Sequence, residues 1–209
     1  MANHWRRAAA VGLLMAVLAV IPAGQTQDLP FRVTRVTDRL TVFQPGESAP
    51  PTASSVITTP AGLLVVDSGL SPTLAEMTRR RIRQELGRDD VAWVINTHHH
   101  FDHTNGNQVY RGAEIIAHEG VPAAMRQFQA DLPQFVAARI SRNAERARER
   151  DASPPGSDRA RSLQEAFLIN RLLIEDLQQG RLVPTPPTRT FSDSLTLKVG
   201  DLEVRLWHV

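Results

Sequence analysis

Residues 91–103 read Val-Ala-Trp-Val-Ile-Asn-Thr-His-His-His-Phe-Asp-His, and four of the seven histidines of the chain fall within them. The run Val91–Ile95 is wholly apolar and short, which predicts a buried strand. Side chains at i and i+2 of an extended segment point the same way, so we expect His98 and His100 to hold one metal ion together. His99 is out of phase with both and is not a predicted ligand.

The next two polar residues of the motif, Asp102 and His103, follow where the chain is expected to turn. They can face the same cavity from the other side and hold a second ion, and Asp102 is also the candidate catalytic residue. Imidazole and carboxylate donors without a thiolate suit zinc, iron or manganese. A metal there would lower the pKa of bound water toward neutrality and make it a nucleophile. The polar segment 104–107, Thr-Asn-Gly-Asn, lets the backbone approach closely, because its third residue is glycine.

Three further residues could belong to the site. Asp67 ends a neighbouring apolar strand, where a carboxylate either starts a helix or hydrogen-bonds a metal-bound imidazole and fixes its orientation. The residues alone do not separate these two interpretations. His118 ends the expected strand 113–117 and His208 lies on an alternating strand, so we interpret both as structural.

Composition limits the class of protein. The chain has 209 residues, 42% of them hydrophobic and 22% charged, which is typical of one globular domain. It contains no cysteine, so disulfides, thiolate nucleophiles and Cys-ligated metals are excluded. Its 24 basic residues nearly balance its 22 acidic ones, for a net charge of +2, which argues against an obligate nucleic-acid binder.

The N-terminus has the pattern of a targeting segment. A short basic head, His4-Trp5-Arg6-Arg7, precedes the apolar run 8–21, and Pro22-Ala23-Gly24 ends it. This order is typical of a secretory signal peptide, here residues 1–24, and the run is too short for a comfortable membrane span. We expect export to the periplasm or the cell exterior, without membrane association after cleavage; an uncleaved N-terminal anchor is the alternative.

The rest of the chain predicts a mixture of strands and helices. Ser71-Pro72 and Gly87 have the residue types that begin and end a helix, which would connect two strands in a βαβ unit. The region 119–179 is helical in pattern, with breaks expected near 131–133 and at 153–156, and its charged stretch 139–150 is interpreted as a solvated face. Short strands are expected at 31–36, 40–43, 55–58, 63–66, 195–197 and 204–207.

The chain resembles the metallo-β-lactamase superfamily. Three features match in order: Val65-Val66-Asp67-Ser68-Gly69, the motif Thr97–His103, and Ile115-Ile-Ala-His-Glu119. The resemblance implies an αββα sandwich with one or two metal ions, usually zinc, at the edge between two sheets. It implies that His98 and His100 bind the first ion, that Asp102 and His103 bind the second, and that Asp67 supports them. A hydroxide on the metals would then attack a carbonyl, phosphate or sulfur-containing substrate.

The later ligands of that superfamily, a His, an Asp or Cys, and a final His, have no counterpart in this sequence. The alternating run 202–209 also ends without a turn residue, which would leave backbone groups unpaired. We therefore expect residues 25–209 to form an incomplete domain: the N-terminal half of the sandwich, a helical insertion at 119–180, and the first strands of the second half.

Three functions remain open on this basis. The first is an exported metal-dependent hydrolase whose small-molecule substrate is a β-lactam or another ester or amide. The second is a glyoxalase-II-like thioester hydrolase, which shares the His-rich run but acts on substrates that are usually cytosolic. The third is a non-catalytic metal-binding fragment, because each ion would have only two protein ligands where catalytic zinc typically has three. The oligomeric state is open.

Overall fold

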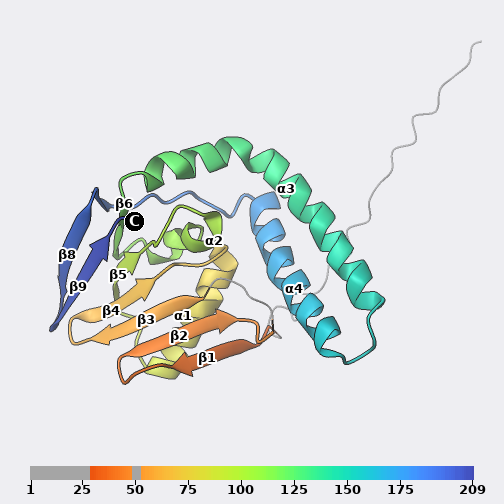
Figure 1. Ribbon diagram of the computed structural model, residues 1–209, viewed down its shortest axis with the longest axis horizontal. Coiled ribbons are helices and arrows are strands. Elements are labelled where there is room, and N and C mark those ends of the chain that lie inside the picture. Colours follow the sequence, from red (N-terminus) through yellow and green to blue (C-terminus); the bar gives the residue numbers. More distant parts are fainter. Residues whose placement is uncertain (1–28, 49–52) are drawn as a thin grey trace, which may run out of the picture.

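The structure is a computed structural model that describes residues 29–48 and 53–209, and it is built around one seven-stranded sheet (Figure 1). The expected signal peptide, residues 1–24, lies outside the described residues. The strands follow one another in sequence order; the first four are antiparallel, and the pairs from β4 to β7 are parallel. They are β1 (Phe31–Arg35), β2 (Leu40–Pro45), β3 (Ser54–Thr59), β4 (Gly62–Val66), β5 (Val91–Ile95), β6 (Glu114–His118) and β7 (Arg189–Phe191).

The predicted βαβ unit is present, with α1 (Pro72–Leu86) connecting the parallel strands β4 and β5. Ser71 caps the helix through its side chain, which accepts a hydrogen bond from the amide of Leu74. Gly87 ends the helix in the left-handed conformation, with φ of 66°, which costs little because glycine has no Cβ. These local signals agree with the tertiary fold, and the helix was predicted at its observed bounds.

The sheet is covered on both faces. Alternate residues of a strand point to opposite sides, so Leu63 and Val65 of β4 pack with Ala75 and Ile82 of α1, whereas Leu64 faces the other way. That other face is covered by the hairpin of β8 (Ser194–Val199) and β9 (Leu202–Trp207), which contributes the buried residues Leu197 and Val199. The layers are therefore helix, main sheet and hairpin.

Two long helices, α3 (Val121–Asp151) and α4 (Asp158–Gln178), form an arch beside these layers (Figure 1). The break expected near residues 131–133 is wrong, because α3 continues through Pro133. Proline removes only its own amide as a donor, and phenylalanines on both sides of it, Phe128 and Phe135, pack against each other at 5.0 Å between ring centroids. The break at 153–156 is confirmed.

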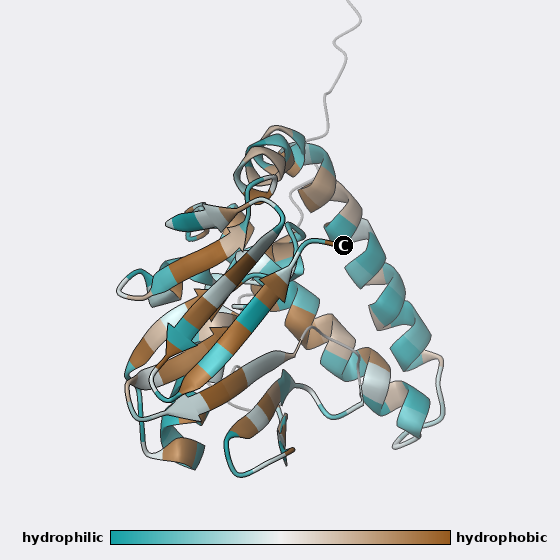
Figure 2. Ribbon diagram, turned by 60° about the vertical axis from the view of Figure 1, so that its left-hand side comes forward, coloured by the Kyte–Doolittle hydropathy of each residue, from teal (hydrophilic) through white to brown (hydrophobic). Residues whose placement is uncertain are grey.

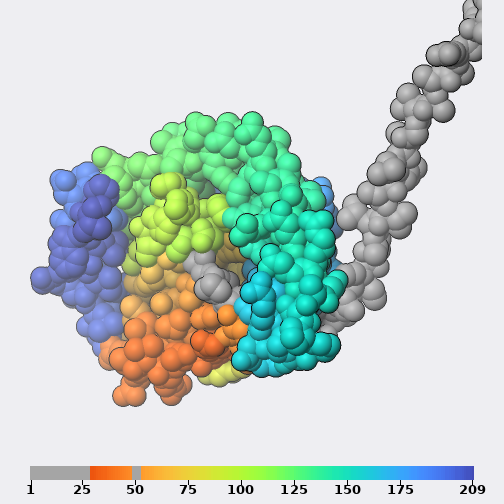
Figure 3. All heavy atoms as spheres, turned by 45° about the vertical axis from the view of Figure 1, so that its right-hand side comes forward, coloured from red at the N-terminus to blue at the C-terminus, as the bar shows by residue number. Residues whose placement is uncertain are grey.

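Space-filling spheres show α3 running from the hairpin side of the molecule across to α4, around the segment that carries the histidine motif (Figure 3). Within the described ranges, no helix is both long enough and apolar enough to span a membrane. The fold therefore places the end of β5 between the layered sheets and the helical arch.

Candidate metal centre

The histidine motif lies at the carboxyl end of β5, next to the carboxyl end of β4. These strands are parallel, so the residues that follow them meet at one edge of the sheet, which is where α/β proteins commonly bind ligands. Residues 97–99 form a bend and α2 (Phe101–Thr104) begins directly after it. The extended conformation expected for the first two histidines is therefore wrong, since the chain turns already at residue 97.

The bend nevertheless brings His98 and His100 together. His98 Nε2 and His100 Nδ1 are 3.0 Å apart, and the ring centroids are 4.6 Å apart. Burial lowers the pKa of the His98 imidazole, and the nearby rings of His103 and His100 lower it further. A lowered pKa keeps the ring neutral at physiological pH, which is the form that ligates a metal.

Asp67 is the residue that orients His103. Its Oδ2 atom accepts a hydrogen bond from His103 Nδ1 at 2.7 Å, and its two oxygens also accept bonds from the amide and hydroxyl of Thr97. Of the two interpretations left open by the sequence, the structure places Asp67 against the imidazole, whereas the cap of α1 is Ser71. With Nδ1 occupied, His103 Nε2 is the ring nitrogen left for a ligand.

His103 also lies beside Asp102, with 3.5 Å between His103 Nε2 and Asp102 Oδ2. Burial alone would lower the pKa of His103, but its hydrogen bond to Asp67 and the charges of Asp67 and Asp102 outweigh burial, so the pKa is raised. The rings of His98 and His103 are 4.0 Å apart between centroids. All four residues predicted as ligands therefore lie in one group; His99 is exposed, as is His100, and its ring lies 4.8 Å from the His100 ring between centroids.

The backbone at Asp67 is unusual. Its φ of 62° makes it the one non-glycine residue with positive φ among the described ranges. This conformation is disfavoured for a residue with a Cβ and is typically retained at functional sites. The surrounding bonds hold it in place, because the Asp67 amide donates to Ile95 O at 2.8 Å.

A buried polar network holds the backbone of the motif in place. The Asn96 side chain donates hydrogen bonds to the carbonyl oxygen of His103 and to the side-chain oxygen of Asn107. Ser68 donates to the same two acceptors, through its amide to His103 and through its hydroxyl to Asn107. Asn107 returns a bond to Asn96 and donates another to Thr185 O. Each polar group finds a partner, so the network fixes the path of the chain on both sides of His103.

The backbone after the motif lies close to the backbone at Ser68, and this approach depends on Gly106, as the sequence indicated. A Cβ on this residue would lie 2.1 Å from the carbonyl oxygen of Ser68 and 2.7 Å from the Cβ of Ala75. The glycine therefore allows the segment after the motif to lie directly on the segment that carries Asp67.

The donor types of this group fit a divalent metal ion. Two imidazole nitrogens converge at His98 and His100, and a third imidazole and a carboxylate follow at His103 and Asp102. In the part of the chain that the structure describes, however, no three or more of these side chains are arranged as a complete metal-binding group. The described residues therefore supply a pair of convergent nitrogens, with two further donors beside it.

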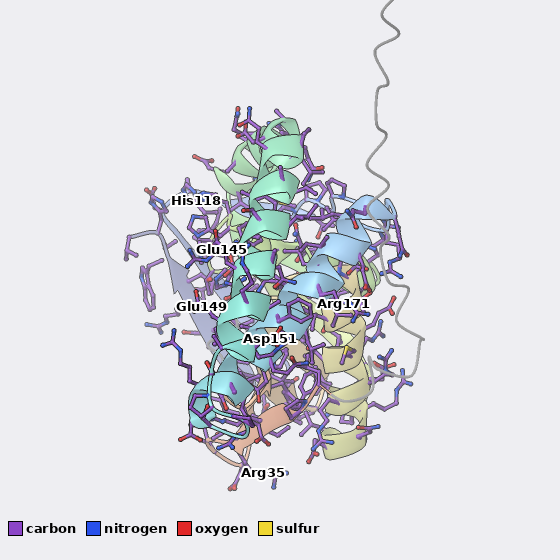
Figure 4. The ribbon with its side chains drawn as sticks, turned by 90° about the vertical axis from the view of Figure 1, so that its right-hand side faces the viewer. Arg35, His118, Glu145, Glu149, Asp151 and Arg171 are labelled. Carbon is purple, nitrogen blue, oxygen red and sulfur yellow. The ribbon has the colours of Figure 1, made fainter. Side chains whose placement is uncertain are left out.

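A cleft of about 670 Å³ opens beside the motif. Its other wall is aromatic, formed by His118 at the end of β6 (labelled in Figure 4), Phe191 of β7, Trp207 of β9, and His208. The rings of His118 and His208 stack at 3.7 Å between centroids, and His118 Nδ1 accepts a hydrogen bond from the Gly120 amide. The expectation that His208 lies within its strand is wrong, since β9 ends at Trp207.

Sequence reasoning did not find Phe191 or Trp207 as residues of this cleft. Phe191 belongs to a three-residue strand that follows a proline-rich segment, and Trp207 lies on a strand far away in the chain. Only the pairing of β7 with β6 and the packing of the hairpin bring them to the motif.

Comparison with known proteins identifies the family. The Metallo-beta-lactamase superfamily matches residues 49–197, well over half of the chain. The chain belongs to this superfamily. Its helix, main sheet and hairpin correspond to the first three layers of the expected αββα sandwich, and this membership supports a metallo-hydrolase at the level of the superfamily.

Solved structures of this superfamily resemble the chain over most of its length. A metallo-beta-lactamase from Pontibacter korlensis is 14% identical, with a TM-score of 0.47 over 85% of this chain and 60% of that one. BJP-1, a subclass B3 metallo-beta-lactamase of Bradyrhizobium japonicum, is 19% identical, with a TM-score of 0.49 over 84% of this chain and 50% of that one. The chain thus spans 50% to 60% of the length of these two proteins. The search of curated proteins found no match.

Proposed function

We propose that this chain carries the metal centre of an exported hydrolase that acts on a carbonyl-type substrate, a β-lactam or another ester or amide. The observation that carries the proposal is the 3.0 Å approach of His98 Nε2 to His100 Nδ1, beside a third imidazole whose other nitrogen is held by Asp67. Membership of the superfamily supports the reaction class.

The residues have distinct roles in this proposal. His98 and His100 hold one ion, and Asp102 and His103 hold a second. Zinc is the metal we propose, and iron or manganese suit the same donors. A bound divalent ion supplies Lewis acidity and lowers the pKa of water. Asp67 keeps the proton of His103 on Nδ1, so that Nε2 stays free to ligate.

The cleft beside the motif supports a small-molecule substrate. Its volume of about 670 Å³ is in the range of small-molecule sites, and its lining mixes aromatic rings with imidazoles. Aromatic walls such as Phe191 and Trp207 would bind the apolar part of a substrate, while His98, the proposed ligand that lines the cleft, would face the group to be hydrolysed.

Metal content is the direct test of the site. We expect the purified chain to bind one or two zinc ions in equilibrium dialysis followed by elemental analysis. The double substitution His98→Ala, His100→Ala should remove at least one of them, whereas His99→Ala, at the exposed histidine between them, should not change the metal content. A wild-type chain without metal, or a double variant with intact metal content, would overturn the assignment.

Turnover tests the substrate class. A carbonyl-type hydrolase should hydrolyse nitrocefin or a simple ester when loaded with zinc, and should lose this activity with the double substitution. Turnover of a thioester in preference to both would instead support the glyoxalase-II-like alternative.

Export is tested separately, because it depends on residues 1–24. The basic head and apolar run support cleavage near Ala23 or Gly24. N-terminal sequencing of the protein recovered from a periplasmic extract should begin close to residue 25, and recovery of the intact Met1 terminus from the cytoplasm would contradict export.

A further inference from the structure

His118 lies beside the histidine motif although it is not part of it. It is the last residue of β6, which pairs in parallel with β5 so that Ile116 is opposite Ile95. Two residues further on, His118 is level with the start of the bend that carries His98, one strand spacing of roughly 5 Å away. Both histidines line the cleft of about 670 Å³. A substrate held at His98 is therefore within reach of His118.

A hydrogen bond to the backbone fixes the tautomer of His118. Its Nδ1 atom accepts from the Gly120 amide at 3.1 Å. A ring nitrogen that accepts a hydrogen bond carries no proton, and an imidazole with one unprotonated nitrogen is neutral, so the proton of this ring lies on Nε2. A protonated Nε2 can donate a hydrogen bond but cannot ligate a metal ion.

Neighbouring rings hold the plane of the His118 imidazole. The ring stacks on His208 with 3.7 Å between centroids and 14° between planes, and it stands nearly perpendicular to Phe191, at 6.1 Å and 84°. The backbone is held as well, because the Glu119 amide donates to Phe191 O at 2.9 Å. The Nε2–H group is therefore fixed before any substrate binds, which is the property that makes a hydrogen-bond donor effective in catalysis.

The fold makes no use of this donor. In the ranges that the structure describes, no protein group accepts a hydrogen bond from His118 Nε2. The side-chain nitrogen and oxygen atoms that are buried there without a partner belong to other residues, so Nε2 is accessible. The ring nitrogens of His98, by contrast, lie 3.1 Å from Thr97 Oγ1 and 3.0 Å from His100 Nδ1. His118 thus presents an accessible, neutral N–H group in the wall of the cleft.

We infer that His118 is a further catalytic residue, whose Nε2–H group donates a hydrogen bond to the carbonyl oxygen of the substrate. The inference rests on the proposed function and adds a residue to it. When hydroxide forms its bond to the carbonyl carbon, the π-electron pair of the C=O bond moves to the oxygen, where the hydrogen bond stabilises the negative charge. The pair returns as the bond to the leaving group breaks, the leaving group takes a proton from water, and His118 keeps its own.

Imidazole NMR of the metal-free chain tests the inference without turnover. With isotope-labelled histidine, we expect the His118 ring to show a protonated Nε2 and an unprotonated Nδ1; the signal is assigned by its loss in His118→Gln. Excess nitrocefin, whose β-lactam carbonyl stays intact without metal, should shift the Nε2–H proton signal downfield. A proton on Nδ1, or an Nε2–H signal that nitrocefin leaves unchanged, would overturn the inference.

Two amide substitutions separate donation to the substrate from a role in the fold. His118→Asn places an oxygen where Nδ1 accepts from Gly120 but removes the donor at Nε2, whereas His118→Gln places an N–H group near Nε2 but removes that acceptor. With nitrocefin and the zinc-loaded chain, His118→Asn should lower kcat about 100-fold with little change in KM, and His118→Gln should stay within about 10-fold of wild type. Thermal unfolding should give the opposite order, because only His118→Gln loses the hydrogen bond to Gly120.

The outcomes are distinguishable from those of the proposed function, which depends on metal content. A chain that binds zinc and hydrolyses nitrocefin, but in which His118→Asn is as active as wild type, overturns the role of His118 and leaves the proposed function in place. A larger loss of kcat in His118→Gln than in His118→Asn also overturns it, because that order follows the bond to Gly120 and indicates a structural role. If the chain binds no zinc or shows no turnover, the imidazole NMR alone decides whether His118 contacts the carbonyl.

Discussion

The segments that form the candidate metal centre and the arch formed by α3 and α4 are held in place by different means. Beneath the motif, Asp67, Ser68, Asn96 and Asn107 are all buried, and each bonds to another member of the network or to the backbone. In α3, by contrast, only Val121, Met125 and Asn143 of 31 residues are buried. In the view of Figure 2 its second half is largely hydrophilic.

The helix α4 of the arch packs on α1 through a hydrophobic cluster that includes Leu74, Met77, Ile169 and Leu172, and polar contacts add to this attachment. Asp176 of α4, fully buried, accepts hydrogen bonds from the amide and hydroxyl of Thr73 at the start of α1. Glu165 accepts bonds from the amides of Glu47 and Ser48, and Phe128 of α3 stacks on Phe101 of α2 at 5.4 Å between ring centroids. The comparison teaches that the geometry of the candidate metal centre depends on a dense buried polar network, whereas the arch is held by the apolar packing of α4 on α1 and by few buried side chains of α3.

The largest effect should come from adding one methyl group beneath the motif. In Gly106→Ala the new Cβ would meet Ser68 O at 2.1 Å, and backbone cannot move as cheaply as a side chain. We expect a loss of about 3 kcal/mol or more in the free energy of unfolding, measured by urea denaturation. Gly112→Ala is the matched control, because a Cβ there meets nothing within 4 Å. Similar stability of the two variants would refute dense packing at this point.

A substitution within α3 of the arch should instead increase the stability of the chain. Pro133 interrupts the hydrogen bonding of α3, so Pro133→Ala should stabilise the chain by about 2 kcal/mol, the helix gain less the entropy that alanine returns to the unfolded state. The urea midpoint should rise accordingly. A decrease would mean that the proline ring itself makes a needed contact.

Loss of the hydrogen bond by which Asp67 orients His103 should lower metal affinity more than it lowers the stability of the fold. Asp67→Asn keeps the shape of the side chain but removes the charge that holds His103 Nδ1. We expect zinc affinity to fall about 10- to 100-fold, measured by competition with a chelator. His99→Ala is the control for the motif. Unchanged affinity in Asp67→Asn would contradict the orienting role.

The smallest effect is expected at the far end of α1, and it should depend on pH. Burial opposes the charge of Asp89, but its hydrogen bonds to Arg79 and Arg83 hold the pKa of its carboxyl below the ordinary value. The stabilisation is therefore present above the unfolded-state pKa of about 3.9 and is lost as pH falls through the folded-state value. Asp89→Asn should cost about 1 kcal/mol at pH 7. The difference in the free energy of unfolding between wild type and variant, measured with urea, should become smaller toward pH 3. A difference that does not change with pH would exclude this linkage.

Much of the fold could be predicted from the sequence, because its signals are local. The helix α1 has its cap, its N1 proline and its terminal glycine within the chain segment itself, and the two-residue turn Pro60-Ala61 joins β3 to β4. Strands β4 to β6 are apolar enough to indicate burial on both faces. The break at Pro133 was predicted from the same local rule and is wrong, because contacts of Phe128 and Phe135 outside the local sequence compensate the lost hydrogen bond.

The residues of the candidate site divide in the same way, into those that the local sequence identifies and those that only tertiary contacts bring to the site. His98, His100, Asp102 and His103 could be named from a seven-residue motif, since their spacing is short and their donor types are specific. Phe191 and Trp207 could not, because each is separated from the motif by more than thirty residues and has no distinctive neighbours in sequence. Their proximity results from the pairing of β7 with β6 and from the packing of the hairpin.

The sequence by itself determined the donor atoms, the strand that presents them and the absence of thiolate chemistry, because these follow from residue type and short spacing. Only the tertiary structure decided what Asp67 does. From the residues it was equally a helix cap or a partner of an imidazole, and the parallel pairing of β4 with β5 places its carboxylate on His103. Distances across a sheet edge depend on strand order and register, and neither is encoded in the few residues that perform the chemistry.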